Sequence, residues 1–236
     1  MPTAVPAYSL VTPVYNEGER VFANLEAIAM VMRMLGPIEL IAVNDGSNDQ
    51  TRSEIERLRQ RLPEIRALHL PHEGKGQALR VGARAATGEY VIFFDSDLDL
   101  PPEQILFFVA LQRAHAADAV IGSKMHPDST VHYPLRRRLY SWGYFLLTKL
   151  LFRLPVRDTQ TGLKLVRRGL LVEALEHTEV KGFAMDLELL VRLVRLRARM
   201  VEAPVVVRYK EKFGGIGFGT VREILAETLA VWKRTR

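Results

Sequence analysis

The first half of this chain alternates short apolar runs with longer stretches whose apolar residues recur at helical spacing. This alternation is typical of β–α–β units, so it predicts an α/β fold with a mostly parallel sheet flanked by helices. Strands are predicted near residues 9–12, 39–44, 65–70, 90–94 and 119–122, and helices near 19–35, 51–61, 75–86 and 102–115.

The second half follows another pattern. A polar loop over 124–134 precedes an amphipathic helix over 139–152, whose apolar face is predicted to carry Trp142, Tyr144 and Phe145. Helical spacing returns over 188–196, a strand is predicted over 200–208, and a glycine-rich segment leads into a C-terminal helix. We expect one domain over residues 1–236, in which 1–123 and 124–236 bind different ligands.

Composition narrows the classes of partner and of site. A net charge of +6 favours an anionic partner such as nucleotide phosphates, lipid phosphates or a membrane face, and charge alone does not exclude nucleic acid. The absence of cysteine excludes disulfides and thiolate metal sites. The N-terminus lacks a signal-peptide pattern, which predicts a cytoplasmic location. The apolar stretch 140–152 is too short to span a bilayer, which takes roughly 20 residues.

Polar segments follow four of the predicted strands. In an open α/β sheet, ligands bind beyond the carboxyl ends of the strands, so these segments are the candidate site. They are Pro-Val-Tyr-Asn-Glu at 13–17, Asn-Asp-Gly-Ser at 44–47, His-Glu-Gly-Lys-Gly at 72–76 and Asp-Ser-Asp-Leu-Asp at 95–99. Neither a dinucleotide-binding G-x-G-x-x-G nor a complete P-loop is present.

Three closely spaced carboxylates, Asp95, Asp97 and Asp99, come directly after an apolar strand. They repel one another unless a cation or solvent intervenes, and Mg²⁺ or Mn²⁺ prefers such oxygen ligands. The alternative is an acidic turn in which Asp99 caps the next helix.

Two further segments have both a structural and a functional interpretation. Asp45 precedes Gly46 in a turn where Ser47 or Asp49 can cap the next helix, or it is a carboxylate for a base or ribose. A capping box is predicted at Thr51 and Glu54. Lys75 lies between two glycines where a helix begins, a position that favours a bound phosphate.

Together, Thr-Pro-Val-Tyr-Asn-Glu at 12–17, Asn-Asp-Gly-Ser at 44–47, Gly-Lys-Gly-Gln-Ala-Leu at 74–79 and Asp-Ser-Asp at 95–97 resemble the GT-A inverting glycosyltransferases of family 2. Gly-Ser-Lys at 122–124, the arginines at 136–138, Asp-Thr-Gln-Thr-Gly-Leu-Lys at 158–164 and the segment 183–190 resemble the dolichyl-phosphate mannosyltransferases and glucosyltransferases. The resemblance implies a GT-A fold, a nucleotide-sugar donor, a Mg²⁺ or Mn²⁺ cofactor and a polyprenyl phosphate acceptor.

The same resemblance implies roles for individual residues. The nucleoside would be held by Pro13, Tyr15, Glu17 and Asp45, the diphosphate by Lys75, and the metal by Asp95, Asp97 and Asp99. The acceptor phosphate would be bound by Ser123, Lys124, Arg136, Arg137 and Ser141, with Arg167 as a further candidate. Asp97, Asp186 and Arg136 are the expected catalytic residues. Lys124 stands where this family usually has arginine, and an ammonium is a poorer bidentate clamp than a guanidinium.

The acceptor determines whether a general base is needed. A sugar hydroxyl requires one, whereas a phosphate monoester, with a second pKa of about 6, arrives mostly as a dianion and requires cations. The basic stretch after Gly122 suits a phosphate, and the amphipathic helix suits the headgroup region of a membrane. Asp186 and Glu188 offer the carboxylates that such a base requires, so a hydroxyl acceptor remains an alternative. With a phosphate acceptor, Asp186 is expected to orient the acceptor-site arginines.

The sequence thus predicts transfer of a hexose from UDP-glucose or GDP-mannose to a polyprenyl phosphate, with inversion. The expected location is the cytoplasmic face of a membrane, with no nucleic-acid partner. A transferase acting on a saccharide or glycolipid hydroxyl and a non-catalytic anion-binding protein remain the alternatives.

Overall fold

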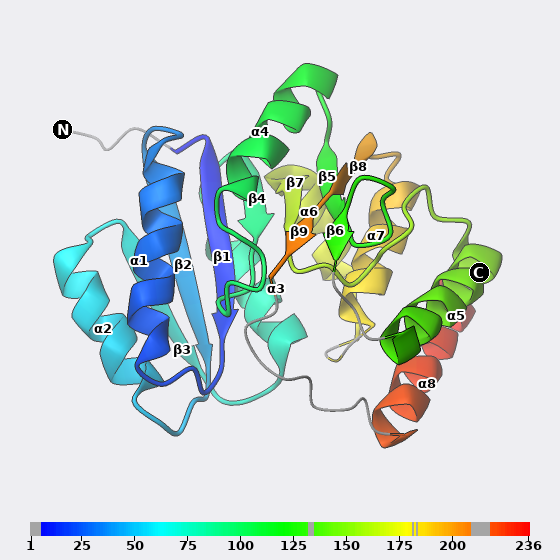
Figure 1. The fold of residues 1–236 in the computed structure, drawn as a ribbon, viewed down its shortest axis with the longest axis horizontal. Coiled ribbons are helices and arrows are strands. Elements are labelled where there is room, and N and C mark those ends of the chain that lie inside the picture. Colours follow the sequence, from blue (N-terminus) through cyan, green and yellow to red (C-terminus); the bar gives the residue numbers. More distant parts are fainter. Residues whose placement is uncertain (1–5, 132–134, 181, 183, 209–217) are drawn as a thin grey trace.

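The computed structural model describes residues 6–131, 135–180, 182, 184–208 and 218–236, without the side chains of 135–140 and 218–221. A seven-stranded sheet runs through the centre, with helices on both faces (Figure 1). The strands are β1 (Tyr8–Val14), β2 (Ile38–Asp45), β3 (Ile65–Leu70), β4 (Tyr90–Phe93), β5 (Ala119–Ser123), β7 (Lys164–Arg167) and β8 (Met200–Pro204). Their order is β3-β2-β1-β4-β7-β5-β8.

The sheet is parallel except at β7, which pairs antiparallel with both β4 and β5. The predicted α/β class with a mostly parallel sheet is therefore confirmed. Two short strands, β6 (Thr130–Val131) and β9 (Val206–Val207), pair with each other beside the main sheet.

Helices bury an apolar core on each face of the sheet. One face is covered by α1 (Arg20–Arg33), α2 (Thr51–Arg61) and α4 (Gln104–His115), which contribute Leu25, Ile55 and Phe108 to the first core. The other face is covered by α3 (Lys75–Ala85), α6 (Arg168–Glu176) and α7 (Met185–Arg195), which contribute Ala83, Leu171 and Leu187 to the second. Because β1, β2 and β4 are buried on both faces, they appear in the sequence as continuous apolar runs.

The remaining two helices lie to one side of the sheet. Helices α5 (Leu135–Phe152) and α8 (Phe218–Arg234) lie side by side there (Figure 1). The hydroxyl groups of Tyr144 and Thr228 are 3.2 Å apart and join the two helices. Within the described ranges, no helix has the length and apolar character needed to cross a bilayer.

Three local predictions differ from the structure, and two elements were not predicted. The amphipathic helix begins at Leu135 rather than 139, and the predicted strand 200–208 is divided into β8 and β9. Strand β7 and helix α6 were not predicted. The capping box is wrong, because the Thr51 hydroxyl accepts a hydrogen bond from the Gly18 amide at 2.9 Å instead of capping its own helix.

A buried carboxylate joins the strands at the end of the sheet where β1 and β2 begin. Glu39 is 7% exposed and accepts hydrogen bonds from the Ser9 hydroxyl at 2.5 Å and the Thr87 amide at 2.8 Å, and it pairs with Arg66. Burial opposes its charge, but these hydrogen bonds outweigh that effect and hold the pKa of Glu39 below the ordinary value of 4.5.

We therefore expect Glu39→Gln to lower the free energy of unfolding at pH 7 by about 1–3 kcal/mol, because it leaves buried donors unpaired. A carboxylate with a depressed pKa stabilises the fold above its unfolded-state pKa and loses this effect as the pH falls. The difference from wild type should shrink in urea titrations below about pH 4.5. Glu64→Gln, at a more exposed ion pair with Arg33, is the matched control and should cost less than about 1 kcal/mol. Equal losses for both variants would contradict this account.

Candidate active site

The turns that follow β1, β2 and β4 meet at the carboxyl edge of the sheet. The Asn16 amide donates to the Ser47 hydroxyl at 3.0 Å, and the Ser96 hydroxyl donates to the Pro13 carbonyl and to the Glu17 carboxylate, each at 3.2 Å. Pro13 and Glu17, both predicted to hold a nucleoside, thus help to join these turns. Three of the polar segments picked out in the sequence form one surface.

Asp45 supports the neighbouring loop from the end of β2. Its carboxylate accepts hydrogen bonds from the amides of Glu73 at 2.9 Å and Gly74 at 3.0 Å, and it lies 2.9 Å from Nδ1 of His72. The side chain is buried, with 4% exposed. The structural interpretation of Asp45 is therefore supported, and its three contacts orient the loop in which Lys75 follows.

An aromatic pair stands next to this loop. The rings of Tyr15 and His72 stack with centroids 4.2 Å apart and planes inclined by 20°. Tyr15 is 46% exposed and His72 is 54% exposed in its side chain. The stacked pair offers a ring face to a planar ligand next to the predicted diphosphate site.

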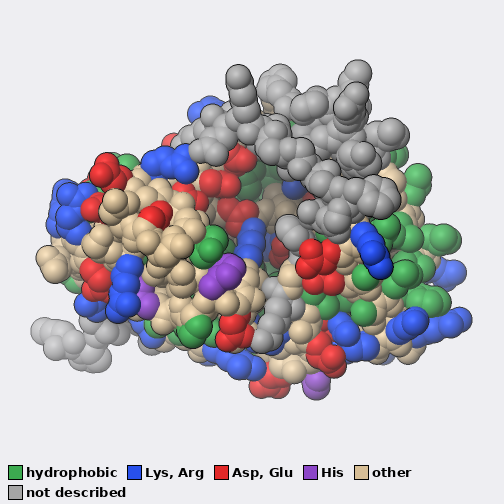
Figure 2. Space-filling view, turned by 90° about the horizontal axis from the view of Figure 1, so that it is seen from below, with side chains coloured by type: hydrophobic (Ala, Val, Ile, Leu, Met, Phe, Trp, Pro, Cys, Tyr) green, Lys and Arg blue, Asp and Glu red, His purple; other side chains and the backbone are tan. Residues whose placement is uncertain are grey.

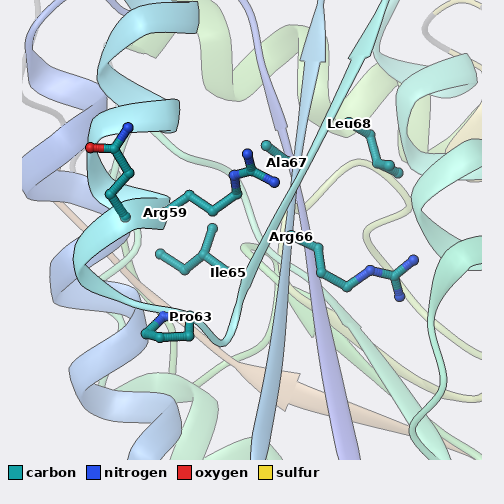
Figure 3. A pocket seen from close by; sticks show the side chains of 7 residues that line it. Arg59, Pro63, Ile65, Arg66, Ala67 and Leu68 are labelled. Carbon is teal, nitrogen blue, oxygen red and sulfur yellow. The ribbon is translucent and has the colours of Figure 1, made fainter.

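Asp95 is enclosed by two different segments of the chain. Its Oδ1 lies 2.5 Å from Nζ of Lys75. Its Oδ2 faces Gly162, where an added Cβ would lie only 2.0 Å from that oxygen. Burial opposes the charge of Asp95, but Lys75, then Lys164 and Lys124, outweigh it and lower its pKa. Figure 2 shows this face of the molecule, with acidic side chains gathered in a hollow beside basic ones.

The turn after Asp95 concentrates negative charge. The Asp97 carboxylate accepts the Asp99 amide at 3.0 Å, and Leu98 between them has a φ of 56°. This left-handed conformation is uncommon for a leucine and costs about 1–2 kcal/mol. Loss of surrounding water, and then the charge of Asp95, raises the pKa of Asp97 to about 6.

We tested whether these residues fit a divalent cation. Carboxylate oxygens are suitable ligands for Mg²⁺ or Mn²⁺, and Asp95, Asp97 and Asp99 bring several of them to one turn. Among the side chains that the structure describes, however, no group of three or more His, Cys, Asp or Glu residues is placed to hold a metal. Asp95, Asp97 and Asp99 are therefore not a preformed three-carboxylate site, because Asp95 pairs with Lys75 and Asp97 bonds to the Asp99 backbone. They fit a cation that takes one or two carboxylates and completes its shell with substrate oxygens.

A fully buried lysine lies behind Asp95. Lys164 begins β7 opposite Phe93, and its side chain is 1% exposed. Its Nζ donates to the Thr161 carbonyl at 2.6 Å and lies 2.9 Å from the carboxylate of Asp186. Lysine is rarely buried unless it is paired, so this ion pair fixes Asp186 at the start of α7.

The loop before β7 also holds Lys124. Asp158 accepts the Lys124 amide at 3.0 Å and the Thr161 hydroxyl at 2.6 Å, and it lies 3.7 Å from Nζ of Lys124. Burial opposes the charge of Asp158, but Lys124 and these hydrogen bonds outweigh it and lower its pKa. Lys124 is consequently held close enough to Asp95 to help lower the pKa of that carboxyl.

Of the other predicted acceptor residues, the structure describes the side chains of Ser123 and Ser141 only, apart from Arg167. Ser123 is buried, and its hydroxyl accepts the Met125 amide at 3.2 Å. Ser141 is partly exposed on α5. Arg136 and Arg137 lie in the first turn of α5, and their side chains are outside the described part of the structure.

Arg167 lies at the opposite end of β7 from Lys164. It lies opposite Tyr90, at the start of β4, whereas Lys164 lies opposite Phe93 at the end of β4. Because β7 is antiparallel, Arg167 is roughly 10 Å further from the carboxyl edge than Lys164. Its guanidinium contacts the Tyr90 hydroxyl at 3.0 Å and Asp118 at 3.2 Å instead.

Sequence reasoning missed the roles of His72, Asp158, Gly162 and Lys164. A lysine between Leu163 and the apolar pair Leu165 and Val166 was the available signal for a buried charge. Asp186 was expected to orient arginines, and the structure gives it Lys164 as its partner.

Comparison with known proteins identifies the family. The chain matches glycosyl transferase family 2 over residues 9–175. It therefore belongs to this family, as the sequence motifs indicated.

The curated relatives are longer proteins. Glycosyltransferase AglD of Haloferax volcanii is 30% identical over 231 residues, which cover 95% of this chain and 36% of that protein. A dolichyl-phosphate beta-glucosyltransferase of Trichomonas vaginalis is 29% identical over 84% of this chain and 62% of its own length. The enzyme of that name from Saccharomyces cerevisiae is 26% identical over 84% of this chain and 65% of its own length.

Solved structures support the fold. Glucosyl-3-phosphoglycerate synthase from Mycobacterium tuberculosis, solved with UDP, superposes with a TM-score of 0.73 over 97% of this chain and 80% of that one, at 20% identity. The same enzyme with Mn²⁺, UDP and glucosyl-3-phosphoglycerate gives a TM-score of 0.70 at 21% identity. The expected GT-A fold is confirmed.

Gly162 gives a direct test of this site. We expect Gly162→Ala to displace Asp95, because overpacking costs about 1–3 kcal/mol, and to weaken UDP or GDP binding about 5- to 150-fold in calorimetric titrations. Gly169→Ala is the matched control, since nothing lies within 4 Å of its added Cβ. Unchanged nucleotide binding in folded Gly162→Ala protein would contradict the packing described for Asp95.

Proposed function

We propose that this chain transfers a hexose from a nucleotide sugar to a polyprenyl phosphate, with inversion and with a divalent cation. The acceptor class is inferred from the contacts of Asp186 and Glu188, the two carboxylates that were candidates for a general base. Asp186 is ion-paired with buried Lys164. If Asp186 took a proton from a hydroxyl, it would lose the negative charge that pairs with Lys164. Glu188 is fully buried and accepts the amides of Glu179 and Val180. A phosphate acceptor requires no base.

The donor is assigned to residues 1–123. Tyr15 and His72 provide a stacking surface for the base, and Asp45 holds the loop that carries Lys75 next to the diphosphate. Asp95 and Asp97 would hold Mg²⁺ or Mn²⁺, with Asp99 completing the turn. When bound, the cation neutralises charge that develops on the leaving nucleoside diphosphate. The Mn²⁺ complexes of the mycobacterial enzyme support this cofactor.

The acceptor is assigned to residues 124–236, together with Ser123 at the end of β5. Lys124 is held by Asp158 near Asp95, and Arg136, Arg137 and Ser141 lie on α5. Cations in these positions would bind an incoming phosphate and orient it toward the donor. The names of the dolichyl-phosphate beta-glucosyltransferases support a polyprenyl phosphate acceptor and favour glucose as the transferred sugar.

An apolar stripe supports binding at a membrane surface. Trp142, Leu146 and Leu150 recur every four residues along α5 and are 49%, 60% and 79% exposed. Leu225 and Leu229 extend the exposed apolar surface on α8. The predicted apolar face of α5 is corrected here, because Tyr144 turns toward Thr228. Exposed apolar stripes with adjacent basic residues suit the headgroup region, and we place the protein on the cytoplasmic face.

Donor and acceptor panels test the proposed reaction. Purified protein with Mg²⁺ or Mn²⁺ should transfer sugar from UDP-glucose or GDP-mannose to a short polyprenyl phosphate, and removal of the metal by chelation should stop transfer. The matched polyprenyl alcohol should accept no sugar. Transfer to the alcohol or to a saccharide, with none to the phosphate, would contradict the proposal.

The same assay separates the second candidate, a transferase that acts on a hydroxyl. If Asp186 is a general base, Asp186→Asn should lower turnover about 10²–10⁴-fold while donor binding is kept. For a phosphate acceptor we expect a loss of less than about tenfold in kcat, because the residual effect comes from Lys164 losing its partner. Measurement of kcat against pH for the wild type and for Asp186→Asn distinguishes the two outcomes.

Membrane binding has its own test. We expect Leu146→Ser/Leu150→Ser to reduce co-flotation with vesicles that contain anionic lipid, because it removes the most exposed part of the stripe. Met30→Ser/Met34→Ser is the control. These side chains, in α1 and just after it, are 64% and 71% exposed, and α1 and α5 lie on opposite sides of Figure 1. Equal flotation of the two variants would argue against the α5 surface.

A further inference from the structure

Both carboxylate oxygens of Asp95 are in contact with the protein itself. Gly162 is packed against Oδ2, and Nζ of Lys75 is 2.5 Å from Oδ1. Gly162 belongs to the loop that Asp158 and Lys164 hold in place, so that side of the carboxylate is enclosed. Of the two contacts, the lysine side chain is the one that can move without moving the backbone. A cation that binds Oδ1 therefore competes with the ammonium group of Lys75 for that oxygen.

Lys75 also lies where a diphosphate would be attracted. It is the first residue of α3, directly after Gly74, which has a φ of 100°. The start of a helix favours anions because its amides and dipole point toward them. The Lys75 side chain is 46% exposed, so it can reach a ligand in the hollow.

The charge on Lys75 is secured by its surroundings. Loss of water opposes the charge, but Asp95, followed by Asp186 and Asp97, outweighs this and raises the pKa of Lys75. The ammonium group is thus a permanent cation with two competing kinds of partner, a carboxylate of the protein and the phosphates of a ligand.

The other two lysines near Asp95 are paired with other carboxylates. Lys164 is buried between the Thr161 carbonyl and Asp186. Lys124 lies beside Asp158 and is bound to it through its backbone amide. Lys75 is the described lysine that contacts Asp95 directly.

We propose that Lys75 is an internal counter-ion of Asp95 which exchanges that carboxylate for the donor diphosphate when a divalent cation binds. This rests on the proposed function, because it assumes a nucleoside diphosphate donor and a cation at Asp95. The exchange makes metal and nucleotide bind cooperatively. A nucleotide alone leaves Asp95 and the phosphates in competition for Lys75, and a metal alone competes with Lys75 without offering it another anion. When both bind, the cation pairs with Asp95 and Lys75 pairs with the phosphates.

Binding of Mn²⁺, measured as free ion by electron paramagnetic resonance, tests the exchange without requiring activity. In the wild type, saturating UDP or GDP should tighten Mn²⁺ binding about 5- to 150-fold. In Lys75→Gln, Mn²⁺ should bind about tenfold more tightly than in the wild type when no nucleotide is present, because no ammonium competes for Asp95. The effect of the nucleotide on Mn²⁺ binding should be much smaller in that variant.

Two further variants exclude simpler explanations. Lys124→Gln removes a positive charge near Asp95 that has no direct contact with it, so it should keep the nucleotide effect. Lys75→Arg keeps a cation and should keep weak Mn²⁺ binding when no nucleotide is present. The proposal is overturned if Lys75→Gln binds Mn²⁺ as the wild type does, or if Lys124→Gln matches Lys75→Gln. A wild type that binds no Mn²⁺ with either nucleotide would instead overturn the metal-dependent part of the proposed function, and this inference with it.

Discussion

The antiparallel pairing of β7 with β4 is the constraint on which the site depends. This pairing brings the start of β7, rather than its end, to the carboxyl edge of the sheet, so the loop 158–163 packs directly against the turn after β4. A parallel strand at this position would place its first residue at the opposite edge. The reversal therefore encloses Asp95 on one side and leaves it open toward Lys75 on the other.

This loop and the first residue of β7 contact both halves of the proposed site. Asp158 fixes Lys124, Lys164 fixes Asp186, and Gly162 contacts Asp95. Partly buried charges are costly unless they are paired, and here Lys75, Lys124 and Lys164 each face a carboxylate. Such pairing holds charged groups in place before a ligand arrives, which suits a reaction whose charge develops on phosphate oxygens.

Much of the fold follows from patterns visible in the sequence. Strands β1, β2 and β4 are apolar runs because both of their faces are buried, and the turns after these three strands meet because parallel strands end at one edge. Strand β7 has only four residues and is bounded by Lys164 and Arg167, so it lacks that pattern. Its direction was unknown without the structure, so the sequence could not show that Arg167 and Lys164 lie at opposite ends of it.

The roles of single polar residues were harder to predict. Asp45 has the residue type expected of a nucleoside ligand, and its carboxylate also accepts the amides of Glu73 and Gly74, contacts that local sequence does not reveal. Likewise, helical periodicity grouped Tyr144 with Trp142 and could not show that Tyr144 contacts Thr228 on a helix more than 70 residues away. Pairings between distant segments determine these roles.

We propose above all that the turn after β4, at residues 95–99, holds the cation that binds the donor diphosphate. Anomalous diffraction from crystals grown with Mn²⁺ and UDP or GDP tests it most directly. We predict a manganese peak in coordination contact with Asp95 or Asp97 and with the diphosphate, and the Lys75 ammonium group moved from Asp95 to a phosphate oxygen. Nucleotide bound at this edge with Lys75 still on Asp95 and no manganese there, or manganese bound elsewhere, would contradict the account.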